Sequence, residues 1–426
     1  MLIYMRFLTR FAPYAALVLI VSGYAALAVK HSIDAPVSET EARTIKAGFA
    51  YLNFFGNEAD IPPIPAIAAA LPYFLQGENE PEPLPSAFYK ARIVGLAAAT
   101  LLLLAAYFSA VLVMGRFWAL LPVIFLAFSP ALADPTTDLT SSLTAFLALN
   151  IMTLFIIAPT RNKSIWLGTS LIAAALSNFT MAILFPIAVL ATIIVYGSGL
   201  LLTWQEIDPA NRRTFLYLRA IKYGTPLLFL TIIAASGLAA TGWLLPPIPA
   251  TETGLMSFLA QNPALNPLAR YGAYFFNQNS MTKIIPILVK TLSWPGFLTI
   301  LLGLFLSVTA AIATFFKNLG ARVLVPIFSF VEIKSIEFIY LLGLVIFYQL
   351  VTFGFWPDIF TGVAAACLFI LASSPIKSWC VGESNYFSGG VRVNISAFDK
   401  RISNQAIKYG LVVIAIIAHV ALAITR

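Results

Sequence analysis

The chain has 426 residues, of which 60% are hydrophobic and only 10% are charged. Soluble domains carry about 25% charged residues, so this composition excludes a soluble globular protein and indicates an all-α, multi-pass integral membrane protein. The net charge of +8 reflects the sorting of loops across a membrane and does not indicate a nucleic-acid partner.

Apolar runs that could cross a bilayer recur along the whole chain. A span needs about 20 apolar residues, and the sequence predicts about eleven such segments. They are 11–29, 93–114, 117–133, 139–158, 164–178, 181–203, 225–245, 294–315, 336–354, 359–374 and 410–424. The first run is too long for the core of a secretory signal, so we expect it to be retained as a helix.

The distribution of Lys and Arg predicts the orientation of these spans. With the N-terminus in the cytoplasm, the cytoplasmic segments hold 17 of the 26 Lys and Arg residues. These segments are 1–10, 115–116, 159–163, 204–224, 316–335 and 375–409. Because positive residues near span ends favour the cytoplasmic side, loops 31–91 and 246–293 and the C-terminus at Arg426 are expected outside.

The first external loop, 31–91, is long, acidic and amphipathic. It holds eight of the eighteen acidic residues of the chain. Two stretches place apolar residues on one helical face: Ile45, Gly48, Phe49, Leu52 and Phe55, then Ile64, Ile67, Ala68, Leu71, Phe74 and Leu75. Such helices lie along a membrane surface, where carboxylates suit chemistry on a lipid-borne head group.

Several polar residues of this loop are candidates for a site. Glu39 and Glu41 flank Thr40 at the start of the first amphipathic stretch, where they either cap the helix or offer a base. Asp60 stands before two prolines and either forms a turn or takes part in the site. His31 directly follows the first span, and we expect it to be an interfacial polar residue rather than a catalytic one.

A second candidate region is the external turn SPALADPTTDL at 129–139. Asp134 and Asp138 are costly to hold at the edge of a bilayer without a partner or a function. The alternative is that Asp134 caps the next helix and Asp138 is a solvated first-turn carboxylate.

Cations near the external span ends complete the candidate set. Lys290 stands where loop 246–293 enters the span that begins near Trp294, either as an interfacial anchor or as a partner for a phosphate. Lys283, Arg270 and Arg92 have the same two interpretations. The only histidines, His31 and His419, are far apart in the chain, so no histidine metal centre is expected. No cofactor is predicted, and a role for a divalent cation stays open.

Four segments resemble a known family in their order and spacing. GFAYL (48–52) and DIPPIPAIAAALPYFL (60–75) are similar to a first external loop of the form DEPxHxxxGxxYL followed by NPEHPPLAKLLAALPL. The turn at 129–139 is similar to SPxxxAxxxxxTTD, and residues 275–304 are similar to WWYYFPVAxxxKTPLPLLLLxLLGL. This is the pattern of the GT-C superfamily of polyprenyl-phosphate-sugar glycosyltransferases, in its bacterial protein-mannosyltransferase and aminoarabinose-transferase branch (family 39 type).

The resemblance implies an organisation and a location. Residues 1–305 would form a GT-C-like transmembrane core that includes loops 31–91 and 246–293. Residues 306–426 would add C-terminal transmembrane helices with a basic cytoplasmic segment at 375–409. The bacterial motifs imply a cell inner membrane, with loop 31–91 in the periplasm.

The chain departs from the family at the catalytic position. Counting back from Gly48, the family's catalytic Asp falls on Thr40 and the following Glu on Glu41. The His of the HPP element falls on Ile61, and the usual Arg-aromatic pair of a late turn is missing at 356–360. The aspartate of the TTD element is kept as Asp138, and the lysine of the KT pair as Lys290.

Three functions follow as hypotheses. In the first, the resemblance implies inverting transfer of a sugar from a polyprenyl-phosphate donor to an acceptor hydroxyl. Glu41, with Asp60 or Asp138, would supply the base, while Lys290, Asp134 and Arg270 would bind the donor. In the second, the loss of the family Asp leaves a catalytically degenerate scaffold or lipid-binding subunit. The third, a transporter or flippase, is disfavoured because no internal repeat is visible.

Overall fold

The computed structural model describes residues 2–33, 35–53, 61–78, 81, 85–132, 211–243, 292–318, 357–381 and 405–425, with scattered positions in 168–177 and 245–270. Within these ranges all regular structure is helical and no strand occurs. The helices are α1 (Leu2–Ile33), α2 (Glu39–Leu52), α3 (Pro63–Phe74), α4 (Tyr89–Met114), α5 (Leu120–Ala127), α9 (Arg212–Gly242), α13 (Trp294–Asn318), α16 (Pro357–Val381) and α18 (Gln405–Thr425). Two short 3₁₀ turns, η1 (Pro85–Ala87) and η2 (Pro130–Leu132), join them.

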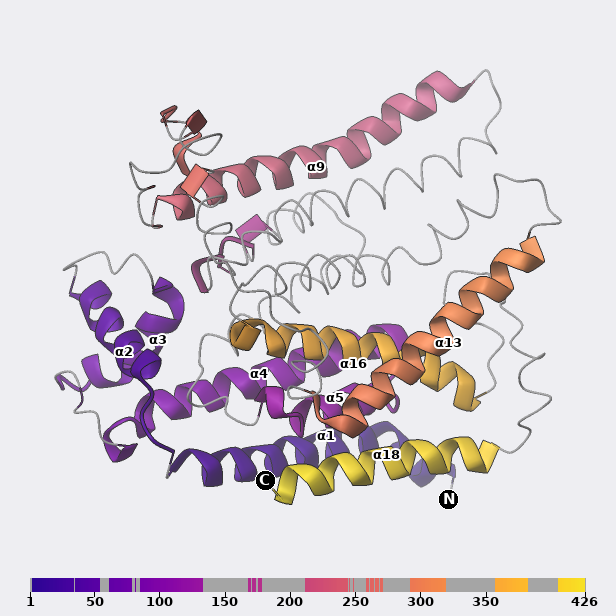
Figure 1. Cartoon of the computed structure of the whole chain (residues 1–426). Coiled ribbons are helices and arrows are strands. Elements are labelled where there is room, and N and C mark those ends of the chain that lie inside the picture. Colours follow the sequence, from indigo (N-terminus) through magenta and orange to yellow (C-terminus); the bar gives the residue numbers. More distant parts are fainter. Residues whose placement is uncertain are drawn as a thin grey trace.

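Long helices form a bundle, and a pair of short helices stands at one end of it (Figure 1). Helix α4 packs on α1, α5 and α16, and α13 packs on α16 and α18. Helices α2 and α3 pack on each other, and α3 also contacts α4. We call the end that carries α2 and α3 the loop end. Helix α9 lies along the opposite side of the bundle from α1 and α18 (Figure 1).

In the described part of the chain, three helices are long and apolar enough to cross a membrane: Phe11–Ser32, Tyr89–Val111 and Ile407–Thr425. They match the predicted spans 11–29, 93–114 and 410–424. In α4, 50% of the residues in the most apolar 18-residue stretch are buried inside the protein. In α18, only 11% of the corresponding residues are buried. Helix α4 is therefore central, and α18 presents most of its apolar surface outward.

The predicted span 117–133 is not one continuous helix. The structure has the eight residues of α5 there, followed by η2. Arg116, before α5, lies over the Tyr14 ring of α1, and Leu132, at the end of η2, accepts a hydrogen bond from Tyr24 near the other end of α1. The segment therefore runs alongside α1 toward the loop end. Leu121, Val123, Phe125 and Leu126 are all buried, so this apolar run fills the centre of the bundle.

Two predicted loop boundaries are also corrected. Helix α9 begins at Arg212, so most of the predicted cytoplasmic loop 204–224 is helical. Helix α16 continues to Val381 and α18 begins at Gln405, so both ends of the predicted segment 375–409 are helical. Hydropathy marks the apolar part of a helix, while polar helical turns beyond it carry no such signal. The predicted spans 139–158, 181–203 and 336–354 lie outside the described residues.

The two amphipathic helices predicted in loop 31–91 are confirmed as α2 and α3. Ser38 caps α2, because its hydroxyl accepts a hydrogen bond from the Glu41 amide at 3.1 Å. The helices approach closely at Gly48, where an added Cβ would lie 2.6 Å from the Cβ of Ala70. The close contact between α2 and α3 therefore requires glycine at position 48, because any larger residue would overlap α3.

Candidate functional site

The dominant polar contact at the loop end joins α2 to α4. Glu41 and Arg92 form a two-point ion pair, with Nε to Oε1 at 2.9 Å and Nη2 to Oε2 at 3.0 Å. Both residues are buried, at 6% and 4% exposure. A planar guanidinium fits a carboxylate in this way, so each oxygen of Glu41 is already occupied.

Arg92 also holds the segment that connects α1 to α2. Its Nη1 donates to the carbonyl oxygens of Ser32 at 2.6 Å and Ala35 at 3.0 Å, and its Nη2 donates to that of Pro36 at 3.4 Å. One side chain thus fixes the end of α1, the start of α2 and the first turns of α4 relative to one another. This geometry favours a positioning role for Glu41 over the predicted base role, and it leaves Arg92 little capacity to bind a phosphate.

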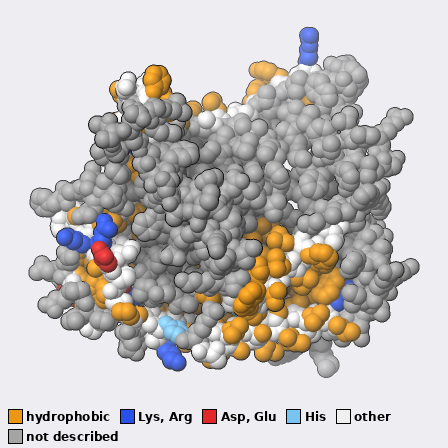
Figure 2. Space-filling view, in the orientation of Figure 1, with side chains coloured by type: hydrophobic (Ala, Val, Ile, Leu, Met, Phe, Trp, Pro, Cys, Tyr) orange, Lys and Arg blue, Asp and Glu red, His pale blue; other side chains and the backbone are white. Residues whose placement is uncertain are grey.

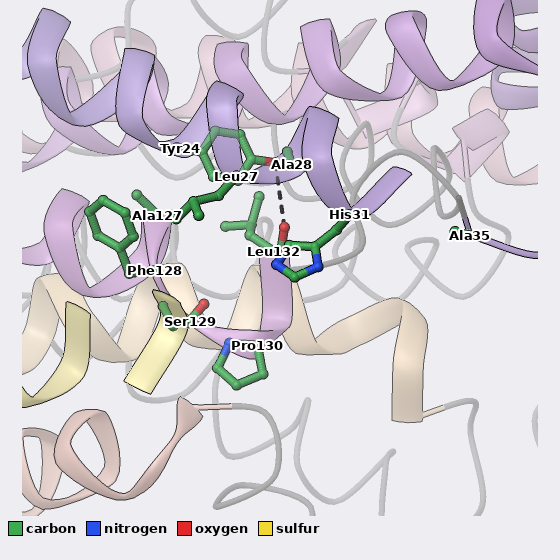
Figure 3. A pocket seen from close by; sticks show the side chains of 11 residues that line it. Tyr24, Leu27, Ala28, His31, Ala35, Ala127, Phe128, Ser129, Pro130 and Leu132 are labelled. Carbon is green, nitrogen blue, oxygen red and sulfur yellow. Dashed lines mark hydrogen bonds between the residues drawn. The ribbon is translucent and has the colours of Figure 1, made fainter. Parts of the chain in front are cut away.

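A cavity of about 310 Å³ opens beside this clamped segment. Its walls come from α1, from the end of α5 with η2, and from the last turns of α18, and they include Tyr24, His31, Ser129, Leu132 and Ala423. In Figure 3 the Tyr24 hydroxyl reaches the Leu132 carbonyl oxygen, at 3.4 Å, and ties η2 to α1. The cavity therefore joins the start of the first external loop to the start of the SPALADPTTDL turn.

A buried histidine fastens three chain segments near this cavity. The Nε2 of His419 lies 2.9 Å from the carbonyl oxygen of Phe125, and Nδ1 lies 2.7 Å from the hydroxyl of Ser293. A carbonyl only accepts, so Nε2 carries the proton and, in the neutral ring, Nδ1 accepts from Ser293. Ser293 has φ 61°, a left-handed conformation at the junction before α13. The network joins α5, the residue before α13, and α18. His419 lies one helical turn before Ala423, which lines the cavity.

Arg270, predicted to bind the donor, instead makes local contacts after α9. Its Nη1 donates to the carbonyl oxygens of Leu245 at 2.9 Å and Trp243 at 3.3 Å, and its Nε donates to the side-chain oxygen of Asn266 at 2.7 Å. The guanidinium also lies over the Trp243 ring, 4.8 Å from its centroid. These contacts satisfy chain carbonyls beyond the end of α9 and account for Arg270 without a phosphate.

The remaining predicted site residues, Asp60, Asp134, Asp138 and Lys290, lie outside the described residues, as does Lys283. Their neighbours in the sequence are described. Leu132, two positions before Asp134, lines the cavity. Ser293, three positions after Lys290, binds the histidine of the helix that closes the cavity. Among the described residues no group of His, Cys, Asp and Glu could hold a metal ion.

Sequence reasoning missed the pairing of Glu41 with Arg92 and the network around His419. The sequence presents Arg92 as an interfacial anchor or a phosphate partner, because it gives no distance between loop and span residues. One signal was available: a charged residue three positions into an apolar helix is costly unless it is paired. Ser293 and His419 are 126 positions apart in the chain, so no local sequence pattern predicts their hydrogen bond.

Exposed side chains distinguish the loop end from the rest of the bundle (Figure 2). Acidic and basic side chains lie together on the face of the loop end, whereas apolar side chains cover the surface beside α13 and α18 (Figure 2). The exposed apolar residues of α18 include Leu411, Val413, Ile414 and Ile417. This pattern suits a bundle whose sides face lipid and whose loop end faces water.

No protein-family model and no curated protein matches the sequence. Solved structures share its fold. The archaeal oligosaccharyltransferase AglB from Archaeoglobus fulgidus, in complex with an inhibitory peptide and a dolichol-phosphate, superposes with a TM-score of 0.52 at 12% identity, covering 97% of this chain and 56% of that chain. The oligosaccharyltransferase of the same organism in complex with Zn and sulfate superposes with a TM-score of 0.52 at 13% identity. That match covers 96% of this chain and 52% of the oligosaccharyltransferase chain. This chain thus spans about half the length of those proteins.

ArnT from Cupriavidus metallidurans, bound to undecaprenyl phosphate, superposes with a TM-score of 0.51 at 12% identity. The match covers 96% of this chain and 70% of that chain. Likeness at this level of identity concerns the fold. The chain has the helical GT-C membrane fold that its sequence motifs predict, the fold seen in AglB and ArnT.

Proposed function

We propose that this chain is a membrane glycosyltransferase that moves a sugar from a polyprenyl-phosphate donor to an acceptor hydroxyl at the loop end. The fold supports this proposal, because the matched structures of AglB and ArnT contain a dolichol-phosphate and undecaprenyl phosphate. The observation that carries it is the cavity at the loop end. The residues that begin loop 31–91 and those that begin the 129–139 turn line this one cavity, which supports a site in these two parts of the chain.

The chemistry requires an attacking oxygen, a proton acceptor and a stabilised leaving group. The acceptor oxygen attacks the anomeric carbon from the side opposite the phosphate, the bond from that carbon to the phosphate oxygen breaks, and the lipid phosphate leaves with the electron pair. Inversion at the anomeric carbon follows. We assign the leaving phosphate to Lys290, since a cation stabilises the negative charge that develops there. We assign Asp138, Asp134 and Asp60 to binding of the sugar. We assign Glu41 a structural role, in which it holds Arg92 in place.

The orientation belongs to the proposal too. The loop end would face the periplasm of a cell inner membrane, with the N-terminus in the cytoplasm. Helices α1 and α18 run in the same direction, since Tyr24 and His31 near the end of α1 line the same cavity as Ala423 near the end of α18. This parallel arrangement agrees with an N-terminus and a C-terminus on opposite sides of the membrane.

A donor panel tests the proposal. Purified chain in liposomes would receive undecaprenyl phosphates that carry different radiolabelled sugars, together with protein, lipid A and cell-wall acceptors. We expect label to leave the lipid fraction with at least one donor, and Asp138→Asn to stop this transfer while thermal unfolding is unchanged. Lys90→Gln, a change on α4 at a residue that does not line the cavity, is the control. Absence of transfer from every donor would contradict the proposal.

One observation favours a second function, a catalytically degenerate scaffold that binds polyprenyl lipid. The family's catalytic Asp is replaced by Thr40, and the adjacent Glu41 is held by Arg92. A scaffold would copurify with polyprenyl phosphate or a partner subunit and release no sugar. The donor panel separates the two functions, because both bind the lipid and only the transferase consumes the donor.

A further inference from the structure

Among the described residues that line the cavity at the loop end, His31 is the one that carries an imidazole. His31 lies in the last turn of α1, is exposed, and lines the cavity together with Ser129 and Leu132 of the opposite wall (Figure 3). Tyr24 is the other titratable residue among those that line it, and its hydroxyl donates to a backbone carbonyl. Imidazole is the side chain that most often serves as a general base.

Among the described residues that line the cavity, His31 is the available base. Glu41, the predicted base, has both oxygens on Arg92. Lys30, in the same turn of α1, is a cation. The wall formed by Ser129–Leu132 contributes no titratable side chain, and α18 contributes Ala423.

The clamp around Arg92 gives His31 a fixed position. Arg92 binds the carbonyl oxygens of Ser32, Ala35 and Pro36, which follow His31 directly in the chain. Across the cavity, the Tyr24 hydroxyl holds Leu132. Hydrogen bonds therefore hold the backbone after His31 and the opposite wall of the cavity in place. A fixed geometry of this kind favours efficient proton transfer.

We propose that His31 is the proton acceptor for sugar transfer, an inference that rests on the proposed function. The acceptor hydroxyl gives its proton to a free ring nitrogen of His31 while its oxygen bonds to the anomeric carbon. The bond from that carbon to the phosphate oxygen breaks, and the electron pair leaves on the polyprenyl phosphate. The imidazolium then releases the proton to water.

Kinetics test this role. General-base catalysis contributes about 10²–10⁴-fold, so His31→Gln should lower kcat by about that factor. The KM for the donor should stay close to the wild-type value. His31→Ala should regain turnover when imidazole is added, because the truncated side chain leaves room beside the cavity. The matched control is Lys30→Gln, which changes the adjacent exposed residue of the same helical turn and should retain wild-type turnover.

The pH dependence of kcat distinguishes a proton acceptor from a residue whose role is only structural. Wild-type kcat should fall as pH drops and the imidazole becomes protonated, and His31→Gln should lose this acidic limb. The charged residues on the neighbouring elements are Lys30 on α1, Glu41 on α2 and Arg92 on α4. Equal turnover in His31→Gln and the wild type, or an unchanged acidic limb, would overturn the role of His31 and leave the proposed function standing.

Binding provides a test that is independent of turnover. The chain has only two histidines, His31 and His419, so histidine labelled with ¹³C at Cε1 gives two signals, and His419→Asn assigns them. Undecaprenyl phosphate in nanodiscs should shift the His31 signal and leave that of buried His419 in place. An unmoved His31 signal would overturn the inference. A moved signal in a wild-type chain that transfers no sugar would overturn both the base role and the proposed function, leaving a lipid-binding scaffold.

Discussion

Arg92 and Glu41, 51 positions apart in the chain, form a buried two-point ion pair that fixes the first surface helix to the start of α4. The same guanidinium holds three carbonyl oxygens of the connection between α1 and α2. One residue thus sets the geometry of the segment that follows His31. The loop end is organised by a structural ion pair at the position where the sequence places a catalytic carboxylate.

Removing one partner of this pair leaves a buried charge without a counterion. We expect Arg92→Ala to lower the free energy of unfolding by about 3–5 kcal/mol, whereas Lys90→Gln, which removes the more exposed pair with Glu78, should cost at most about 1 kcal/mol. Thermal unfolding in detergent measures both. Similar losses in the two variants would contradict a structural role for the buried pair.

The double variant Glu41→Leu with Arg92→Met separates an anchor from a base. Apolar residues of similar volume can replace a buried ion pair at little cost in stability. We therefore expect the double variant to be more stable than Arg92→Ala and to retain measurable sugar transfer. A stable double variant without any transfer would show that the reaction needs this pair, either through the Glu41 carboxylate or through the hold of Arg92 on the segment after His31.

Gly48 tests the contact between α2 and α3. A methyl group there would overlap the backbone of Ala66 and the side chain of Ala70. We expect Gly48→Ala to cost about 1–3 kcal/mol through overpacking, although alanine is the better helix former. Lys46→Ala, an exposed change in the same helix, is the control and should have little effect. Unchanged or higher stability of Gly48→Ala in thermal unfolding would contradict this close approach.

Ser293 and His419 should contribute jointly to stability. Ser293→Ala removes the hydrogen bond of the hydroxyl to the buried Nδ1 of His419, a loss that costs about 1–3 kcal/mol. In His419→Phe the acceptor is gone, so adding Ser293→Ala should cost less than it does in the wild type. A double-mutant cycle by thermal unfolding measures the difference. Additive effects would show that the hydrogen bond at 2.7 Å contributes nothing.

The surface helices should weaken at alkaline pH. Burial raises the pKa of Tyr73 above its ordinary value of 10.0, and its hydroxyl donates to the carbonyl oxygen of Ala87 at 2.7 Å. The unfolded chain loses this proton first, so the contribution is fully present below a pH of about 10 and is lost as pH rises further. The fall in the unfolding midpoint between about pH 9 and 11 should be shallower in Tyr73→Phe than in the wild type. The exposed Tyr89→Phe, as control, should keep the wild-type slope, and equal slopes in all three proteins would be inconsistent with the shift.

The sequence predicted the parts of the fold that depend on local pattern. The amphipathic periodicity of Ile45 and its neighbours yields α2, and the apolar runs yield α1, α4 and α18. Within 117–133 the apolar run is broken into α5 and η2 and fills the bundle core, a tertiary arrangement that a hydropathy window does not register. The start of loop 31–91 and Ser129 and Leu132 of the turn line one cavity, whereas the placement of Asp60, Asp134, Asp138 and Lys290 stays a prediction. The pairing of Glu41 with Arg92 depends on packing between segments far apart in the chain, so no local pattern predicts it.

If a polyprenyl phosphate is used in the loop-end cavity, the lipid should be visible there. Electron cryomicroscopy of the chain in nanodiscs with undecaprenyl phosphate can locate it. We expect phosphate density in or at the mouth of the cavity bounded by His31, Ser129 and Ala423, with the isoprenoid chain leading into the bilayer. An empty cavity with the lipid ordered on another face of the bundle would contradict this expectation.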